Sequence, residues 1–113
     1  MKRELLVVAP IPPELRERLS KNYTLLDARP AAGETRPGMP VAVTTSVAGF
    51  DRALMESLPD LMLIACNGTG LDRIDMAAAQ ARGIAVQHTP DVVTEDTADC
   101  AIGLMYALVR RIA

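Results

Sequence analysis

Short apolar runs alternate with helical patterns along most of this chain, and no other feature constrains the fold as strongly. Five runs rich in aliphatic and β-branched residues are each short enough for a strand: 5–9, 23–26, 41–44, 61–66 and 84–87. Helical patterns lie between them, and they span 12–21, 51–58 and 75–82. Most of the apolar runs lack two-residue alternation, which indicates strands covered on both faces.

Strands and helices in this order form a parallel sheet joined by right-handed crossovers. We therefore predict an α/β fold, a flavodoxin-like doubly wound parallel sheet of about five strands with helices on both sides. The exception is 29–40, which carries three prolines and two glycines without apolar periodicity, and we expect a mobile surface loop there. Residues 1–93 are predicted to form this lobe, and 94–113 a separate helical unit.

The final segment is predicted to be a long apolar helix from about 95 to 112. Thr94 is a candidate N-cap, two acidic residues follow it, and two arginines stand near the end, as the helix dipole favours. Apolar residues go almost all the way round: Ala98, Cys100, Ala101, Ile102, Leu104, Met105, Ala107, Leu108 and Val109. Such a helix is either a buried core helix or is covered by another domain or a second copy of the chain.

Composition and charge exclude several classes of protein. The 113 residues are enough for one domain, and a hydrophobic content of 50% is enough for one core. Twelve basic and 14 acidic residues give a formal charge of -2 without a basic stripe, so we expect no nucleic-acid partner. The apolar run at 5–9 is too brief for a secretory signal or a membrane span, and we expect a cytoplasmic protein with no membrane partner.

Few residues of this chain could hold a metal or act in catalysis. Cys66 and Cys100 are the only cysteines and His88 the only histidine, which cannot assemble a zinc site from the preferred ligands. We expect both thiols to be reduced and buried, and no adjacent cation lowers their pKa. His88 can act as a general acid, but the sequence places no carboxylate beside it, and a turn-stabilising role is the alternative.

A glycine turn follows the fourth predicted strand, at the edge where open α/β sheets bind ligands. Gly68, Thr69 and Gly70 allow a sharp turn whose N–H groups could form a nest for a carboxylate, while an ordinary structural turn is the alternative. The turn does not read as a dinucleotide fingerprint. Arg73 stands at the third glycine position, and acidic residues stand where a pyrophosphate would lie.

Five stretches between 58 and 112 carry a family resemblance, and they read L-P-D-L-M-L-I-A, G-L-D-R-I-D, R-G-I-A-V, T-P-D-V-V-T-E-D-T-A-D and G-L-M-Y-A-L-V-R-R. In these stretches the chain resembles the D-isomer-specific 2-hydroxyacid dehydrogenases, a family that includes glyoxylate and hydroxypyruvate reductases and glycerate dehydrogenase. The resemblance is weaker over 1–50. It corresponds to the N-terminal substrate-binding domain of that family.

The resemblance implies a site for the carboxylate of a small 2-keto or 2-hydroxy acid. It places the carboxylate on the backbone amides of Thr69 and Gly70, in the turn that begins at Gly68. It lines the pocket with the loop 46–50, which holds Val47 and Ala48. The family turn more often reads S-V-G. Because the implied contacts are made by the backbone, this departure concerns side-chain packing rather than the anion site.

The resemblance also implies NAD or NADP, held by a second domain that supplies G-x-G-x-x-G and the catalytic Arg, Glu and His. Thr97 is the residue it would place near the nicotinamide, with ordinary helix capping as the alternative for this side chain. The helix at 94–112 would pack in a homodimer, and a helix from the distant C-terminus would complete the lobe.

None of these second-domain features is found in 1–113. We therefore predict a truncated 2-hydroxyacid dehydrogenase that has no catalytic residue of its own, binds no cofactor by itself and is inactive alone. The alternative is a stand-alone flavodoxin-like module for binding small anions or for dimerisation.

Overall fold

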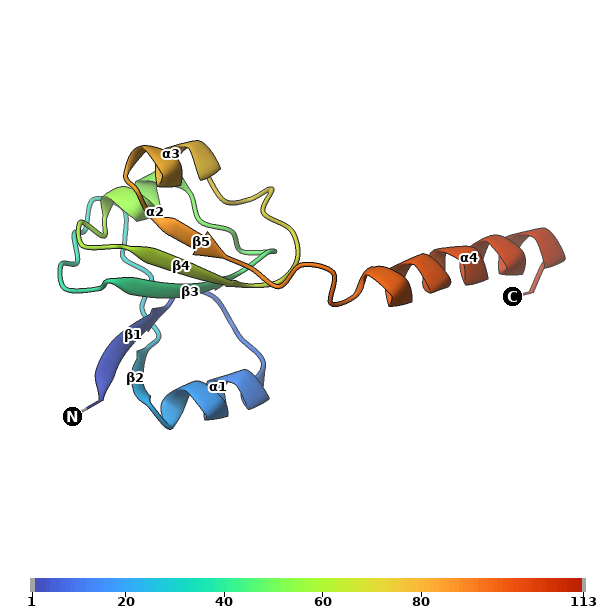
Figure 1. Ribbon diagram of the computed structural model, residues 1–113, viewed down its shortest axis with the longest axis horizontal. Coiled ribbons are helices and arrows are strands. Elements are labelled where there is room, and N and C mark those ends of the chain that lie inside the picture. Colours follow the sequence, from blue (N-terminus) through green and yellow to red (C-terminus); the bar gives the residue numbers. More distant parts are fainter. Residues whose placement is uncertain (1, 113) are drawn as a thin grey trace.

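The predicted order of strands and helices is the observed one. The structure, a computed structural model, describes residues 2–112. Its elements are β1 (Arg3–Val7), α1 (Pro13–Ser20), β2 (Tyr23–Leu26), β3 (Val41–Thr45), α2 (Arg52–Glu56), β4 (Leu63–Asn67), α3 (Met76–Ala81), β5 (Ala85–Gln87) and α4 (Thr94–Arg110). The strands pair in parallel in the order β2-β1-β3-β4-β5 (Figure 1). The α/β prediction is confirmed.

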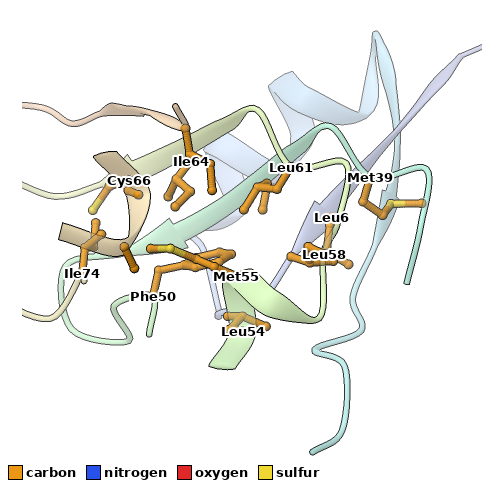
Figure 2. Packing of buried hydrophobic residues seen from close by; sticks show 14 residues of the cluster. Leu6, Met39, Phe50, Leu54, Met55, Leu58, Leu61, Ile64, Cys66 and Ile74 are labelled. Carbon is orange, nitrogen blue, oxygen red and sulfur yellow. The ribbon is translucent and has the colours of Figure 1, made fainter. Parts of the chain in front are cut away.

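One side of the sheet carries the main hydrophobic core. α2 and α3 pack over this side, and their buried residues meet the strands beneath them (Figures 1 and 2). Phe50, Met55 and Ile64 are each at most 1% exposed. Burying each side chain of this size stabilises the fold by about 1.5–3 kcal/mol. This core fixes the positions of β3 and β4, whose carboxyl ends carry the candidate site.

The opposite side of the sheet is only partly covered. α1 packs there over a smaller cluster formed by Leu5, Val7, Ile11 and Val43. Burial alternates along β4, and the two outer residues of β5 are exposed. The prediction that most strands are covered on both faces is therefore wrong for β4 and β5. α1 lies beside β2 and leaves an apolar hollow along Leu19, Val43 and Ala65.

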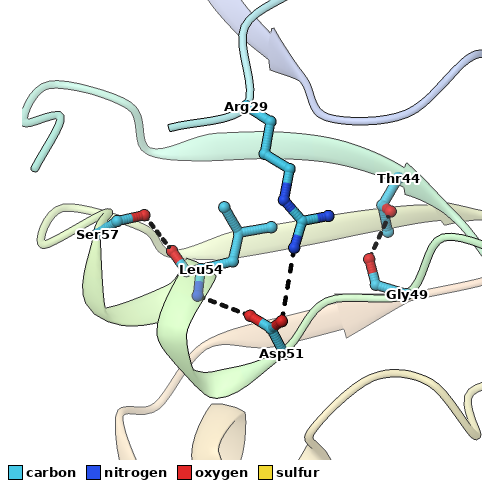
Figure 3. Close-up of polar contacts among 6 residues, drawn as sticks. All are labelled: Arg29, Thr44, Gly49, Asp51, Leu54 and Ser57. Atoms are coloured by element: carbon cyan, nitrogen blue, oxygen red, sulfur yellow. Dashed lines mark hydrogen bonds and ion pairs between the residues drawn. The ribbon is translucent and has the colours of Figure 1, made fainter. Parts of the chain in front are cut away.

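The segment 29–40 forms neither helix nor strand, as predicted, yet it is tied to the lobe. Arg36 N donates to Ser57 O at 2.7 Å, and Gly38 N donates to the Asp60 carboxylate at 2.7 Å. Met39 is buried in the main core. Arg29, at the start of the segment, lies 3.5 Å from the carboxylate of Asp51 (Figure 3).

α4 projects away from the sheet and packs against no other element (Figure 1). It has no buried residue, so it is not a core helix of this chain. Large apolar side chains on it are exposed, including Leu104, Leu108 and Val109. Cys100 is exposed as well, so the prediction that both thiols are buried is wrong for it, because no other helix or strand within 2–112 packs against α4.

The helix begins differently from the prediction. Val93, not Thr94, is the N-cap, and its carbonyl accepts from Thr97 N at 2.9 Å. The Thr94 hydroxyl donates to the Asp91 carboxylate at 3.2 Å, so it leaves the helix N–H groups uncapped. Among residues 2–112, no helix has the length and hydropathy that crossing a membrane requires.

Candidate functional site

Two loops meet at the carboxyl edge of the sheet because the strands that precede them, β3 and β4, end at the same level. Thr45 and Asn67 are register partners at the ends of β3 and β4, so 46–50 and 68–70 start side by side. Gly68 has a φ of +153°, and a Cβ on it would stand 2.7 Å from the Ser46 Cβ. Only glycine allows this close approach.

The loop 46–50 is held at its base from inside the sheet. The buried Thr44 hydroxyl donates to Gly49 O at 2.7 Å (Figure 3). Gly49 N donates to Thr45 O at 2.9 Å, and Ala48 N donates to the Thr45 hydroxyl at 3.1 Å. Phe50 anchors the end of the loop in the core. Val47 and Ala48 therefore lie at an exposed tip on a fixed base.

The glycine turn is tied to the segment that follows β5. His88 Nδ1 lies 2.9 Å from Thr69 O, and because a carbonyl only accepts, this nitrogen is the donor. The Thr69 hydroxyl donates to Thr89 O at 3.1 Å, and Thr89 N donates to Gly68 O at 3.0 Å. His88 thus has the turn-stabilising contact, and within 2–112 no carboxylate is hydrogen-bonded to it.

The turn leaves donors free at its surface. Within the described residues, the N–H groups of Thr69 and Gly70 have no acceptor, and both residues are exposed. Beside them lies an open hollow of about 270 Å³ lined by Ser46, Val47, Gly70, Asp72 and Arg73. Unpaired amides beside a guanidinium suit a carboxylate, while the adjacent carboxylate at position 72 opposes highly charged ligands. Of the predicted residues, Val47 and Gly70 line this hollow, whereas Gly68, Thr69 and Ala48 are not among its lining residues.

The same edge does not fit a dinucleotide. The Asp75 carboxylate already accepts from Ala78 N at 2.9 Å and caps α3, so a pyrophosphate has no free helix end here. Thr97 lies in the projecting helix, and the structure does not bring it to the turn. Burial raises the pKa of the Cys66 thiol, which keeps it protonated and unreactive. No group of three metal-binding side chains gathers within 2–112.

The sequence and the fold match one protein family. The family model for the D-isomer specific 2-hydroxyacid dehydrogenase, catalytic domain, matches residues 5–107. The chain belongs to this family. This dehydrogenase chain is 38% identical to glyoxylate/hydroxypyruvate reductase A HPR2 of Arabidopsis thaliana, over 96% of the chain and 36% of that relative. It is 34% identical to 2-ketogluconate reductase of Gluconobacter oxydans, over 98% of the chain and 36% of that relative.

Solved structures of other hydroxyacid dehydrogenases show the same lobe. A 2-hydroxyacid dehydrogenase from Ketogulonicigenium vulgare matches with a TM-score of 0.80 and 34% identity, over 95% of this chain and 36% of that one. An NADPH-dependent glyoxylate/hydroxypyruvate reductase from Sinorhizobium meliloti, solved with NADP and malonate, matches with a TM-score of 0.78 and 33% identity. That match covers 95% of this chain and 34% of the reductase. The dehydrogenase chain thus spans about a third of the length of these relatives.

Two residues that line the hollow, Asp72 and Arg73, were not predicted as members of the site. The sequence singled them out only as departures from a dinucleotide fingerprint, whereas Ser46 belongs to the loop that was expected to line the pocket. An arginine inside G-L-D-R-I-D, directly after the glycine turn, is a local signal that points to this edge. Its contact partner depends on which strands are adjacent, which the local signal does not contain.

Proposed function

We propose that this chain is the substrate-binding lobe of a glyoxylate or hydroxypyruvate reductase-like enzyme. In this proposal the free N–H groups of Thr69 and Gly70 hold the carboxylate of a small 2-keto or 2-hydroxy acid. The observation that carries it is the hollow between the glycine turn and the loop 46–50, here named the substrate loop, with Val47 at its edge. Malonate and citrate, the acids present in two structures of the Sinorhizobium meliloti relative, share the carboxylate chemistry.

In this proposal the lobe binds and orients the acid, while a second domain supplies the groups that carry out the reduction. Reduction of a keto acid needs a hydride donor, a proton donor and a cation near the carbonyl. We place the nicotinamide, NAD or NADP, and the catalytic side chains on a second domain beyond 1–113, with Thr97 near the interface between the domains. We expect the lobe alone to be inactive, and the cytosol to be its compartment because both cysteines are free thiols.

The test is a ligand titration that is monitored through the backbone amide NMR signals of the chain. Glyoxylate and hydroxypyruvate are added to the chain at constant ionic strength, with chloride as the inert anion. The proposal predicts selective shifts for the amides of Thr69, Gly70 and Val47, and no comparable shifts with chloride. A well-folded chain whose turn amides respond to none of the keto acids would contradict the proposed carboxylate site.

A second function, self-association through 94–112, is favoured by one observation. α4 exposes apolar side chains on several sides, with Leu108 81% and Val109 77% exposed. Exposed apolar surface on this scale marks an interaction site or an aggregation liability. A homodimer that pairs two such helices would remove the surface from water. The half-covered sheet face beside α1 is a separate surface, for which we propose a helix from the remainder of the enzyme.

Sedimentation velocity distinguishes a dimeric from a monomeric lobe. We expect the chain to sediment as a dimer at micromolar concentration, and the double variant Leu104→Glu/Leu108→Glu to sediment as a monomer with the same circular dichroism. Met62→Glu is the control. It adds a charge at an exposed position outside α4 and should leave the dimer intact. A monomeric unaltered chain at the highest concentration tested would contradict this second function.

A further inference from the structure

The tip of the substrate loop is fastened by one side chain from a distant part of the sequence. Arg73 Nη1 donates to Val47 O at 3.0 Å, across a separation of 26 positions. Val47 itself is 74% exposed and packs into no core, so its backbone carbonyl is the group that holds it. Within 2–112 this is the one side-chain hydrogen bond of Arg73.

The backbone of Arg73 is fixed against the base of the same loop. Phe50 N donates to Arg73 O at 2.9 Å, and Asp75 N donates to Phe50 O at 2.9 Å. Phe50 and Ile74 form a parallel bridge. Gly49 has a φ of +70°, and a Cβ on it would stand 2.8 Å from the Arg73 carbonyl carbon. The arginine therefore starts from a rigid position at the loop base and reaches over to the loop tip.

We infer that Arg73 is a positioning residue that holds the substrate loop in its binding conformation beside the glycine turn. The inference rests on the proposed function and deepens it, because the loop and the turn line one hollow. A guanidinium can donate to the Val47 carbonyl and still present further N–H groups and its charge to an anion. A loop that is already ordered loses less conformational entropy when the ligand binds.

The test separates loop order from ligand binding. Arg73→Met keeps the aliphatic stem and removes every donor, and Arg73→Lys retains one cationic donor. Arg52→Met is the matched control, since Arg52 is an exposed arginine that lies 3.6 Å from the Asp75 carboxylate and is not among the residues that line the hollow. Amide hydrogen exchange of Val47 and Ala48 is measured without ligand, and the Kd for glyoxylate is measured by NMR titration.

We expect Arg73→Met to speed exchange at the loop tip at least about threefold and to weaken glyoxylate binding about three- to tenfold. Arg73→Lys should recover part of both effects, and Arg52→Met should change neither. Unchanged exchange at the tip, or faster exchange with unchanged affinity, would overturn the inference. A lack of keto-acid binding in the unaltered chain would contradict the proposed function, while the ligand-free exchange still decides whether Arg73 orders the loop.

Discussion

Gly68 lies against Ser46 so closely that a Cβ on residue 68 would stand 2.7 Å from the Ser46 Cβ. Its φ of +153° is also one that side chains with a Cβ rarely adopt. We predict that Gly68→Ala lowers the free energy of unfolding by about 1–3 kcal/mol, because strain and overlap add. Urea denaturation with a constant m-value measures this change.

Gly33 provides a comparison that separates backbone strain from steric overlap. Gly33 has a φ of +82° but open space around it, so Gly33→Ala carries the backbone strain without the overlap. The double variant Gly68→Ala/Ser46→Gly removes the overlap and should recover part of the lost stability. If Gly68→Ala costs no more than Gly33→Ala, contact between the two loops does not restrict residue 68.

The hydroxyl of Thr44 makes a buried hydrogen bond inside the core. It is fully buried, and its donation to Gly49 O at 2.7 Å supports the base of the loop 46–50. Thr44→Val keeps the shape but leaves the Gly49 carbonyl without this donor, which should cost about 1–3 kcal/mol of unfolding free energy. Thr24→Val on the exposed part of β2 is the control. Equal stability of both variants in thermal unfolding would show that the bond contributes nothing.

The fold was predictable because each strand and helix carries its own local signal. Apolar runs, prolines near the start of α1 and the glycine after α3 all act within a few residues. The glycine turn was predictable for the same reason. The closeness of Ser46 to Gly68 was not, because it depends on β3 and β4 being neighbours in register. The N-cap at Thr94 was wrong because its hydroxyl bonds to Asp91 instead of the helix.

An ion pair between α1 and the end of β2 predicts acid sensitivity. Arg16 contacts the Asp27 carboxylate at 2.8 and 2.5 Å. Hydrogen bonding to Arg16 lowers the pKa of Asp27 below its ordinary value, which is about 3.9. The stabilisation from this pair is therefore present above the unfolded pKa and is lost as the pH falls through the folded pKa.

We predict that Asp27→Asn reduces the dependence of the urea midpoint on pH below about pH 4. The effect should be small because both side chains are largely exposed. The pKa of Glu34 is also lowered, mainly by the hydrogen bond from the Ala31 N–H and to a smaller extent by the one from Arg36. Glu34→Gln should therefore also reduce the pH dependence of the urea midpoint, independently of Asp27→Asn. Identical pH profiles for the unaltered chain and Asp27→Asn would refute the assignment.

The two cysteines give a direct readout of how α4 is covered. Cys100 is exposed on α4, whereas Cys66 is buried beneath α3 and its pKa is raised by burial. We predict that a maleimide labels Cys100 at least about tenfold faster than Cys66, because reaction requires an accessible thiolate. Mass spectrometry of the labelled peptides measures the two rates, and Cys100→Ser should abolish the fast phase.

Since self-association through α4 would cover Cys100, its labelling should slow as protein concentration rises, while the slow rate at Cys66 stays constant. A rate at Cys100 that is independent of concentration would mean that the helix contacts no second copy near this residue.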